Sequence, residues 1–264
     1  MSKDATADRL EFVASKAPAV TLGFWIIKIL ATTLGETGGD TVTMTLNWGY
    51  LAGTALFLGL LAVLVVVQIR ARVFHPALYW ATIVASTTAG TTMADFADRS
   101  LGIGYTGGSA LLLTLVILSL AAWRWVEGTV SVDSVTTPRA EAFYWLTITF
   151  SQTLGTALGD WIADDTGLGY LGGAAVFGGA LLLVALAYFF TRISRVPLFW
   201  AAFILTRPLG ATVGDFLDKP LADGGLALSR PIASLAIGVV MVILIAVLPQ
   251  RAGGHAPASP KPVA

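Results

Sequence analysis

Four aspartates recur at one fixed position in a very apolar chain, and they are the residues from which chemistry could come. Each follows a tryptophan by fifteen residues and a glycine by five, as in "YWLTITFSQTLGTALGD" at 144–160. Carboxylate oxygens can attract cations, exchange protons or bind hard metal ions such as Mg²⁺, Ca²⁺ or Mn²⁺. The four aspartates are Asp40, Asp95, Asp160 and Asp215.

The same spacing divides the chain into four repeats. The tryptophans step by 55, 65 and 55 residues, so the chain also consists of two halves offset by 120 residues. Each repeat has room for a hairpin of two spanning helices, so all four insert in the same orientation as parallel repeats. The four aspartates are therefore expected at one membrane face. The repeated tryptophans and glycines are Trp25, Trp80, Trp145, Trp200, Gly35, Gly90, Gly155 and Gly210.

This pattern resembles a bacterial membrane-protein family of four tandem two-helix repeats of unknown function, whose members are described as uncharacterised membrane-anchored proteins. The resemblance covers about residues 18–249 and rests on the four Trp-to-Asp units. It implies eight transmembrane helices and a location in the bacterial cytoplasmic (inner) membrane. It implies no activity, so the function has to be argued from the residues.

Composition independently favours the lipid bilayer as the solvent of this chain. The 264 residues are 56% hydrophobic and 12% charged, with a mean hydropathy of +0.78, whereas soluble proteins have roughly 25% charged residues. A net charge of zero argues against a nucleic-acid partner. Cysteine is absent, which excludes disulfides, thiolate metal ligands and cysteine nucleophiles. No cofactor is expected.

Eight apolar segments are long enough to cross the hydrocarbon core as helices. We therefore predict an all-α polytopic membrane protein with spans at about 18–39, 48–69, 76–95, 105–125, 141–160, 170–191, 197–215 and 231–249. The predicted parts are an N-terminal segment (1–17), a first half with repeats 1 and 2 (18–126), a linker (127–140), a second half with repeats 3 and 4 (141–249) and a disordered tail (250–264).

The distribution of Lys and Arg predicts that both termini are cytoplasmic. Only Arg99, Lys219 and Arg230 fall in loops on the aspartate side. The opposite side collects Lys3, Arg9, Lys16, Arg70, Arg72, Arg124, Arg139, Arg192, Arg195, Arg251 and Lys261.

The first helix of each repeat carries a polar stripe, in steps of four residues back from its aspartate. The second helices carry no comparable stripe, so the first helices are expected to form an inner ring and the second helices to face lipid. Small residues four apart before each aspartate let neighbouring helix backbones approach closely. The tryptophans are interpreted as interfacial anchors or packing residues. The stripe includes Thr32, Thr87, Thr91, Gln152 and Thr156.

Three ionisable residues fall inside the expected spans. Lys28 lies about ten residues into its span, near the midplane, where insertion scales give a lysine a penalty of about +2.5 to +3.5 kcal/mol. Glu36 and Arg207 belong to the first and fourth repeats, which are neighbours if the repeats close into a ring. We predict that Glu36 pairs with Arg207 and that Lys28 lies deeper in the same cavity. The alternative is an ion pair that only fixes helix packing.

The aspartate side is rich in acids. It holds ten acidic residues against three basic loop residues, or four with Arg207. One interpretation is a negatively charged vestibule that concentrates cations, and the other is an ordinary solvated loop surface. The loop acids are Asp98, Asp164, Asp165, Asp218 and Asp223.

These features favour a transporter or channel-like carrier of a small charged solute, with a cation preferred, because intramembrane ionisable residues mark solute pathways. The positive charges of Lys28 and Arg207 leave an anionic or zwitterionic solute open. A membrane-embedded enzyme acting on lipid or phosphate esters, with a metal at Asp95/Asp98 or Asp215/Asp218, is one alternative, although motifs for such chemistry are absent. A scaffold or sensor is the other. The substrate, the coupling ion, any metal and a homo-oligomeric state are left open.

Overall fold

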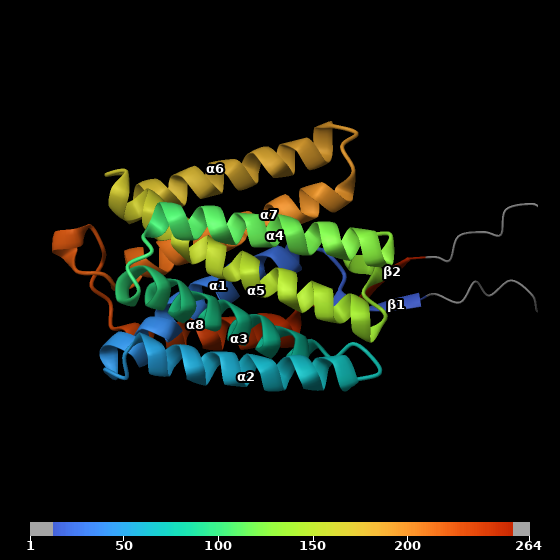
Figure 1. Cartoon of the computed structure of the whole chain (residues 1–264), viewed down its shortest axis with the longest axis horizontal. Coiled ribbons are helices and arrows are strands. Elements are labelled where there is room, and N and C mark those ends of the chain that lie inside the picture. The colour runs from blue at the N-terminus through green and yellow to red at the C-terminus, as the bar shows by residue number, and fades with distance from the viewer. Residues whose placement is uncertain (1–12, 256–264) are drawn as a thin grey trace, which may run out of the picture.

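The computed structural model describes residues 13–255, whose regular elements are helices apart from one short two-stranded sheet (Figure 1). Each of the eight apolar segments forms one long helix of this region. The helices are α1 (Leu22–Asp40), α2 (Tyr50–Arg70), α3 (Pro76–Asp95), α4 (Tyr105–Glu127), α5 (Pro138–Asp160), α6 (Gly169–Phe190), α7 (Arg195–Asp218) and α8 (Arg230–Val247).

Local sequence explains where several of these helices begin. Thr21 caps α1, because its side chain accepts a hydrogen bond from the backbone N–H of Phe24 at 3.2 Å. Thr137 caps α5 in the same way. Proline occupies the first turn of α3, α5 and α8, where no backbone N–H is needed.

Five helices of the described region, α2, α4, α6, α7 and α8, are long and apolar enough to cross a membrane by length and composition. The chain therefore has the character of a membrane protein. α1, α3 and α5 are less apolar because they carry the charged and threonine-rich stripes.

The first helices of the four repeats form the centre of the bundle, as the polar stripes predict. α1 packs against α3 and α7, and α5 packs against the same two helices. The second helices lie outside, and each packs mainly on the first helix of the following repeat: α2 on α3, α4 on α5, α6 on α7, and α8 on α1. Figure 1 shows α2 and α6 on opposite sides of the molecule.

The two helices of one repeat make few contacts with each other. The hairpins expected from the sequence are therefore connected units but not packed pairs. After its aspartate, each of the first three repeats continues into a π-helical turn, and then a glycine with positive φ precedes the second helix, as at Gly49 (φ 78°) and Gly104 (φ 77°). Glycine accepts this left-handed conformation without a steric penalty. The π-helical turns are η1 (Thr41–Thr45), η2 (Phe96–Ser100) and η4 (Trp161–Asp165).

The repeated glycines set how closely the inner helices approach. An added Cβ at any of the four would lie under 3.0 Å from a residue of the next repeat, and that residue always stands eight positions before an aspartate. These contacts form a closed ring, because the glycine of the fourth repeat contacts the first repeat. The contacts are Gly35 with Thr87, Gly90 with Gln152, Gly155 with Arg207, and Gly210 with Thr32.

A closed circle of aromatic side chains packs at the end of the bundle opposite the aspartates. In each repeat the tryptophan and the aromatic residue before it pack edge to face, with ring centroids 5.0 to 5.4 Å apart. The preceding aromatic also contacts the tryptophan of the next repeat, again around a closed ring. The tryptophans therefore act as packing residues. The inter-repeat pairs are Phe24–Trp80, Tyr79–Trp145, Tyr144–Trp200 and Phe199–Trp25.

A small sheet covers this aromatic end. β1 (Val13–Pro18) pairs antiparallel with β2 (Ala252–His255), and η3 (Val132–Ser134) in the linker between the halves contacts both strands. The indole N–H of Trp80 donates to the side chain of Gln250 at 3.0 Å. The prediction of a disordered tail over 250–264 is therefore wrong for residues 252–255, because backbone pairing with β1 orders them. Residues 1–12 and 256–264 lie outside the described residues.

The glycine contacts predict a sharp difference between two glycine substitutions. Gly155→Ala places a Cβ against the side chain of Arg207, so we expect it to lower the free energy of unfolding by about 1 to 3 kcal/mol. Gly179→Ala in α6 meets nothing within 4 Å and should leave stability unchanged or raise it, because alanine favours helix. Thermal unfolding of both purified variants in detergent, followed by tryptophan fluorescence, measures this. Equal melting temperatures would refute the assignment of close packing to Gly155.

Candidate functional site

The repeat positions stack as four buried layers along the inner helices. The side chains at the aspartate position and four, eight and twelve residues before it are all at most 3% exposed. From the aspartate end inward, the layers are Asp40, Asp95, Asp160 and Asp215; Glu36, Thr91, Thr156 and Ala211; Thr32, Thr87, Gln152 and Arg207; and Lys28, Ile83, Ile148 and Phe203.

Arg207 links all four inner helices near the middle of this stack. Its Nη2 lies 2.8 Å from Glu36 Oε2 and 2.6 Å from Thr91 Oγ1, and it also donates to the hydroxyl of Thr156. The predicted Glu36–Arg207 ion pair is therefore confirmed. The fourth repeat has Ala211 in the layer of these three partners, and the guanidinium of Arg207 extends from the layer below to contact them.

Lys28 lies deeper, as predicted, but the surroundings of its ammonium differ from the predicted wet cavity. Its Nζ lies 3.4 Å from Thr206 Oγ1 and 4.2 Å from the centre of the Phe203 ring. The side chain is fully buried, and among the described residues it has no carboxylate partner. Lys28 and Arg207 are both 0% exposed in this conformation.

The carboxylates at the aspartate end are buried and mostly paired, so this end differs from both interpretations of the sequence, a charged vestibule and a solvated loop surface. Lys219 Nζ lies 3.0 Å from both Asp40 and Asp215, thereby joining α1 to α7. Arg99 pairs with Asp95 at 2.8 Å. Arg230 lies 3.6 Å from Asp40 and 3.3 Å from Asp218. All three loop bases on this side therefore neutralise acids.

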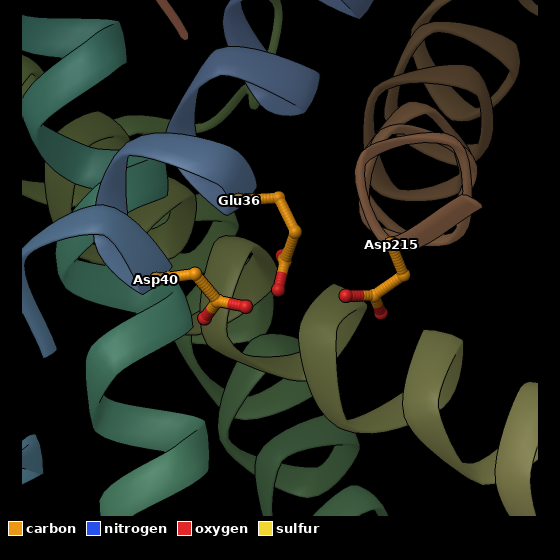
Figure 2. A group of neighbouring side chains, drawn as sticks. All are labelled: Glu36, Asp40 and Asp215. Carbon is orange, nitrogen blue, oxygen red and sulfur yellow. The ribbon is translucent and has the colours of Figure 1, made fainter. Parts of the chain in front are cut away.

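Glu36, Asp40 and Asp215 form an acidic group across α1 and α7. One carboxylate oxygen from each lies within 4.8 Å of the others, and Figure 2 shows the three carboxyl groups turned toward one another. This spacing suits a hard cation. In this conformation the ammonium of Lys219 supplies a positive charge to two of the three. The metal pairs considered from sequence are different, because Arg99 binds Asp95 and Arg230 approaches Asp218.

Asp160 differs from the other three repeat aspartates, since it has no ion pair within residues 13–255. The residue four positions after the aspartate explains the difference. It is basic in the second and fourth repeats, Arg99 and Lys219, and acidic in the third, where Asp164 accepts a hydrogen bond from Tyr105 at 3.2 Å. The third repeat therefore presents a buried carboxylate without an ion pair in the described region, although the charge of Arg99 still acts on it.

Burial disfavours the charge on Lys219, but the carboxylates of Asp215, Asp40 and Asp218 outweigh this effect and raise the pKa of Lys219. The ammonium is therefore firmly charged at neutral pH. From the sequence alone, Lys219, Arg99 and Arg230 are only loop charges and belong to no predicted site. The i,i+4 spacing of Lys219 after Asp215 and of Arg99 after Asp95 was the signal that could have paired them.

The four buried layers follow the units of a known repeat. The model of a family described as Repeat of Unknown Function (DUF347) matches residues 23–74, 78–129, 143–194 and 198–249. The chain belongs to this family. Each DUF347 repeat contains one inner helix and the outer helix that follows it, which confirms the four tandem repeats inferred from sequence. Comparisons with curated proteins and with solved structures found no match.

Breaking the ion pair between the first and fourth DUF347 repeats should strongly destabilise the protein. Removing the second charge as well should reverse much of the loss. Arg207→Met leaves Glu36 charged and buried without a partner, so we expect a loss of about 3 to 5 kcal/mol in the free energy of unfolding. Adding Glu36→Gln should recover much of that loss. The control is Arg139→Met, whose exposed pair with Glu127 should contribute less than about 1 kcal/mol. A double variant as unstable as the sum of the single variants would contradict the pairing.

Lys219 predicts an effect on stability that persists from pH 7 to pH 9. Lys219→Met removes the positive charge that two buried aspartates share, and we expect it to destabilise the protein. Because the pKa of Lys219 is raised by folding, its stabilising effect is fully present below the unfolded value of about 10.4 and declines only at higher pH. The melting temperature of the variant should therefore lie below that of the wild type at both pH 7 and pH 9. A difference that vanishes by pH 9 would refute this.

Proposed function

We propose that this protein is an integral membrane transporter or channel-like carrier of a small charged solute, with a cation favoured. Its eight long helices cross the membrane as four parallel repeats, with both termini on the cytoplasmic side. The path runs along the axis between α1, α3, α5 and α7. One observation carries the proposal: a continuous stack of buried polar and ionisable side chains extends from the four aspartates to Lys28.

The chemistry of the stack supports a solute path more than simple packing. Arg207 Nε and Nη1, both polar atoms of the Gln152 amide and the hydroxyl of Thr87 are buried without a hydrogen bond inside the described region. Buried polar atoms are nearly always bonded, because an unmade bond is expensive. A solute moving along the axis would find these donors and acceptors already oriented toward it.

Cation preference follows from the aspartate end. Asp160 carries a buried carboxylate with no ion pair in residues 13–255, and Glu36, Asp40 and Asp215 have the spacing of a cation site. Low-dielectric walls strengthen the attraction of such a cluster for cations. A cation entering there competes with the ammonium of Lys219 for Asp40 and Asp215.

The described conformation is closed, so transport requires the axis to open. Arg207 is the natural gate, since its guanidinium contacts residues of the other three inner helices. Pro208 follows it inside α7, and a proline removes one helical hydrogen bond and favours a kink at that point. Bending of α7 there would withdraw the guanidinium from the axis.

A non-transporting scaffold is the second candidate, favoured by the complete burial of Lys28 and Arg207. In that case the ionisable residues fix the helix packing of the closed bundle and no solute crosses. The membrane-embedded enzyme lacks a comparable observation, since bases accompany the carboxylate pairs that it would use.

Flux through purified protein in liposomes tests the proposal. Proteoliposomes are screened with Mg²⁺, Mn²⁺, protons and small anions, and we expect flux of a cation that falls at least about tenfold in Asp160→Asn, because one buried carboxylate supplies the unpaired charge. Lys28→Met should also change the flux or its selectivity. Asp165→Asn is the matched control, as Asp165 is an exposed neighbour at the same end and should leave flux unchanged.

The outcome separates the two candidates. Flux lost in Asp160→Asn but retained in Asp165→Asn, with both variants folded, supports the axial path. Absence of flux for every solute in well-folded wild-type protein supports the scaffold.

A further inference from the structure

An apolar groove opens on the side of the bundle between α6, α1 and α7. Its volume is about 880 Å³, within the range of pockets that hold drug-sized ligands. One wall is the last part of α6, and the other walls are the first halves of α1 and α7, with β2 at one end. Leu181, Val184, Phe199 and Ile29 are typical of its lining.

The groove exists because α6 and α1 do not close on each other. In the first half of the chain, α2 packs on α3 and also touches α5, whereas the corresponding helix α6 packs on α7 but makes fewer contacts with α1. Figure 1 shows α6 along the outer edge of the bundle. The seam between the fourth and first repeats is thus covered less by α6 than the corresponding seam is by α2.

The position of the groove identifies lipid as its occupant. α6 and α7 are both apolar and long enough to span a membrane, and little of α6 is covered by the rest of the protein. Along α7 the groove runs from Arg195 to Thr206, eleven residues or about 16 Å of helix. That length is about half of the roughly 30 Å hydrocarbon core, so it matches one acyl chain of a single leaflet.

A cationic group lies at the end of the groove farthest from Thr206. The guanidinium of Arg195 lies 4.1 Å from the Tyr188 ring centre, and its Nη1 donates to the backbone carbonyl of Tyr188. Its remaining N–H groups have no protein partner in the described region. Phe189 and Phe190 beside it are 74% and 81% exposed, as expected of aromatic residues at a membrane interface. Asp133, the acid at this end, lies against Gly253 of β2.

Arginine is suited to phosphate, because its planar group offers two parallel N–H donors to two oxygens. We propose that the groove binds one acyl chain of an anionic membrane phospholipid, and that Arg195 holds the phosphate of its headgroup. The far end of the chain would then lie beside Thr206, whose hydroxyl accepts a hydrogen bond from Lys28. The lipid completes the seam between the first and fourth repeats. This assignment is independent of whether a solute crosses the axis.

Native mass spectrometry of the full-length protein, released from nanodiscs of mixed phosphatidylglycerol and phosphatidylcholine, tests the site. We expect one retained phospholipid per chain, with phosphatidylglycerol preferred. Ala185→Trp places a large ring in the groove and should abolish the adduct, while Leu183→Trp, on an exposed face of the same helix outside the groove, should keep it. Arg195→Gln should keep a lipid but lower the preference for phosphatidylglycerol by about tenfold. Arg124→Gln, an exposed base on α4, should not.

Several results would overturn the assignment. A wild-type protein without a retained lipid, or an adduct that survives Ala185→Trp in a folded protein, would show that the groove is not a lipid site. An unchanged lipid preference in Arg195→Gln would remove the headgroup contact. An adduct that appears only after deletion of residues 256–264 would assign the groove to the tail of the chain, and a dimer peak lost in Ala185→Trp would assign it to a second copy.

Discussion

The structure depends on four glycines that let the inner helices touch almost backbone to backbone. At Gly35, Gly90, Gly155 and Gly210 atoms of the neighbouring helix occupy the space that a Cβ would need. Without a hydrophobic drive between helices in lipid, such close van der Waals contact is what holds helices together. Because the same contact occurs four times around a closed ring, equivalent residues of all four repeats come to the same level. Every buried layer follows from that register.

This register brings ionisable groups into a core that would otherwise exclude them. A charge is tolerated in hydrocarbon only with a partner or a polar surround, and the ring supplies both. Glu36 and Arg207 meet because the first and fourth repeats are neighbours, and two threonines complete the coordination of the guanidinium. Polar groups concentrate where the repeats depart from fourfold symmetry. In the fourth repeat, the guanidinium of Arg207 extends into the layer that holds Ala211. In the first repeat, Lys28 lies in the same layer as Phe203.

The sequence predicted the helices well, because apolar length, proline at helix starts and a fixed Trp–Gly–Asp spacing are local or periodic signals. It also predicted the Glu36–Arg207 pair, once the repeats were assumed to close. It did not predict that α2 packs on α3 and not on α1. The second helix of each repeat is uniformly apolar, so its sequence does not select a partner. The pairing of Lys219 with Asp40 joins residues 179 positions apart and depends on that closure. The strand at 252–255 was missed because "AGGH" resembles a flexible tail until β1 is beside it.

The way each outer helix packs on the inner helix of the following repeat has a consequence for biosynthesis. A chain emerging from the ribosome can place α2 on α3 and α4 on α5 as each is made, but α1 receives its cover, α8, only when the last helix has been made. Until α7 arrives, Glu36 also lacks its cationic partner. The first helix to be made is thus the last to have its packing completed.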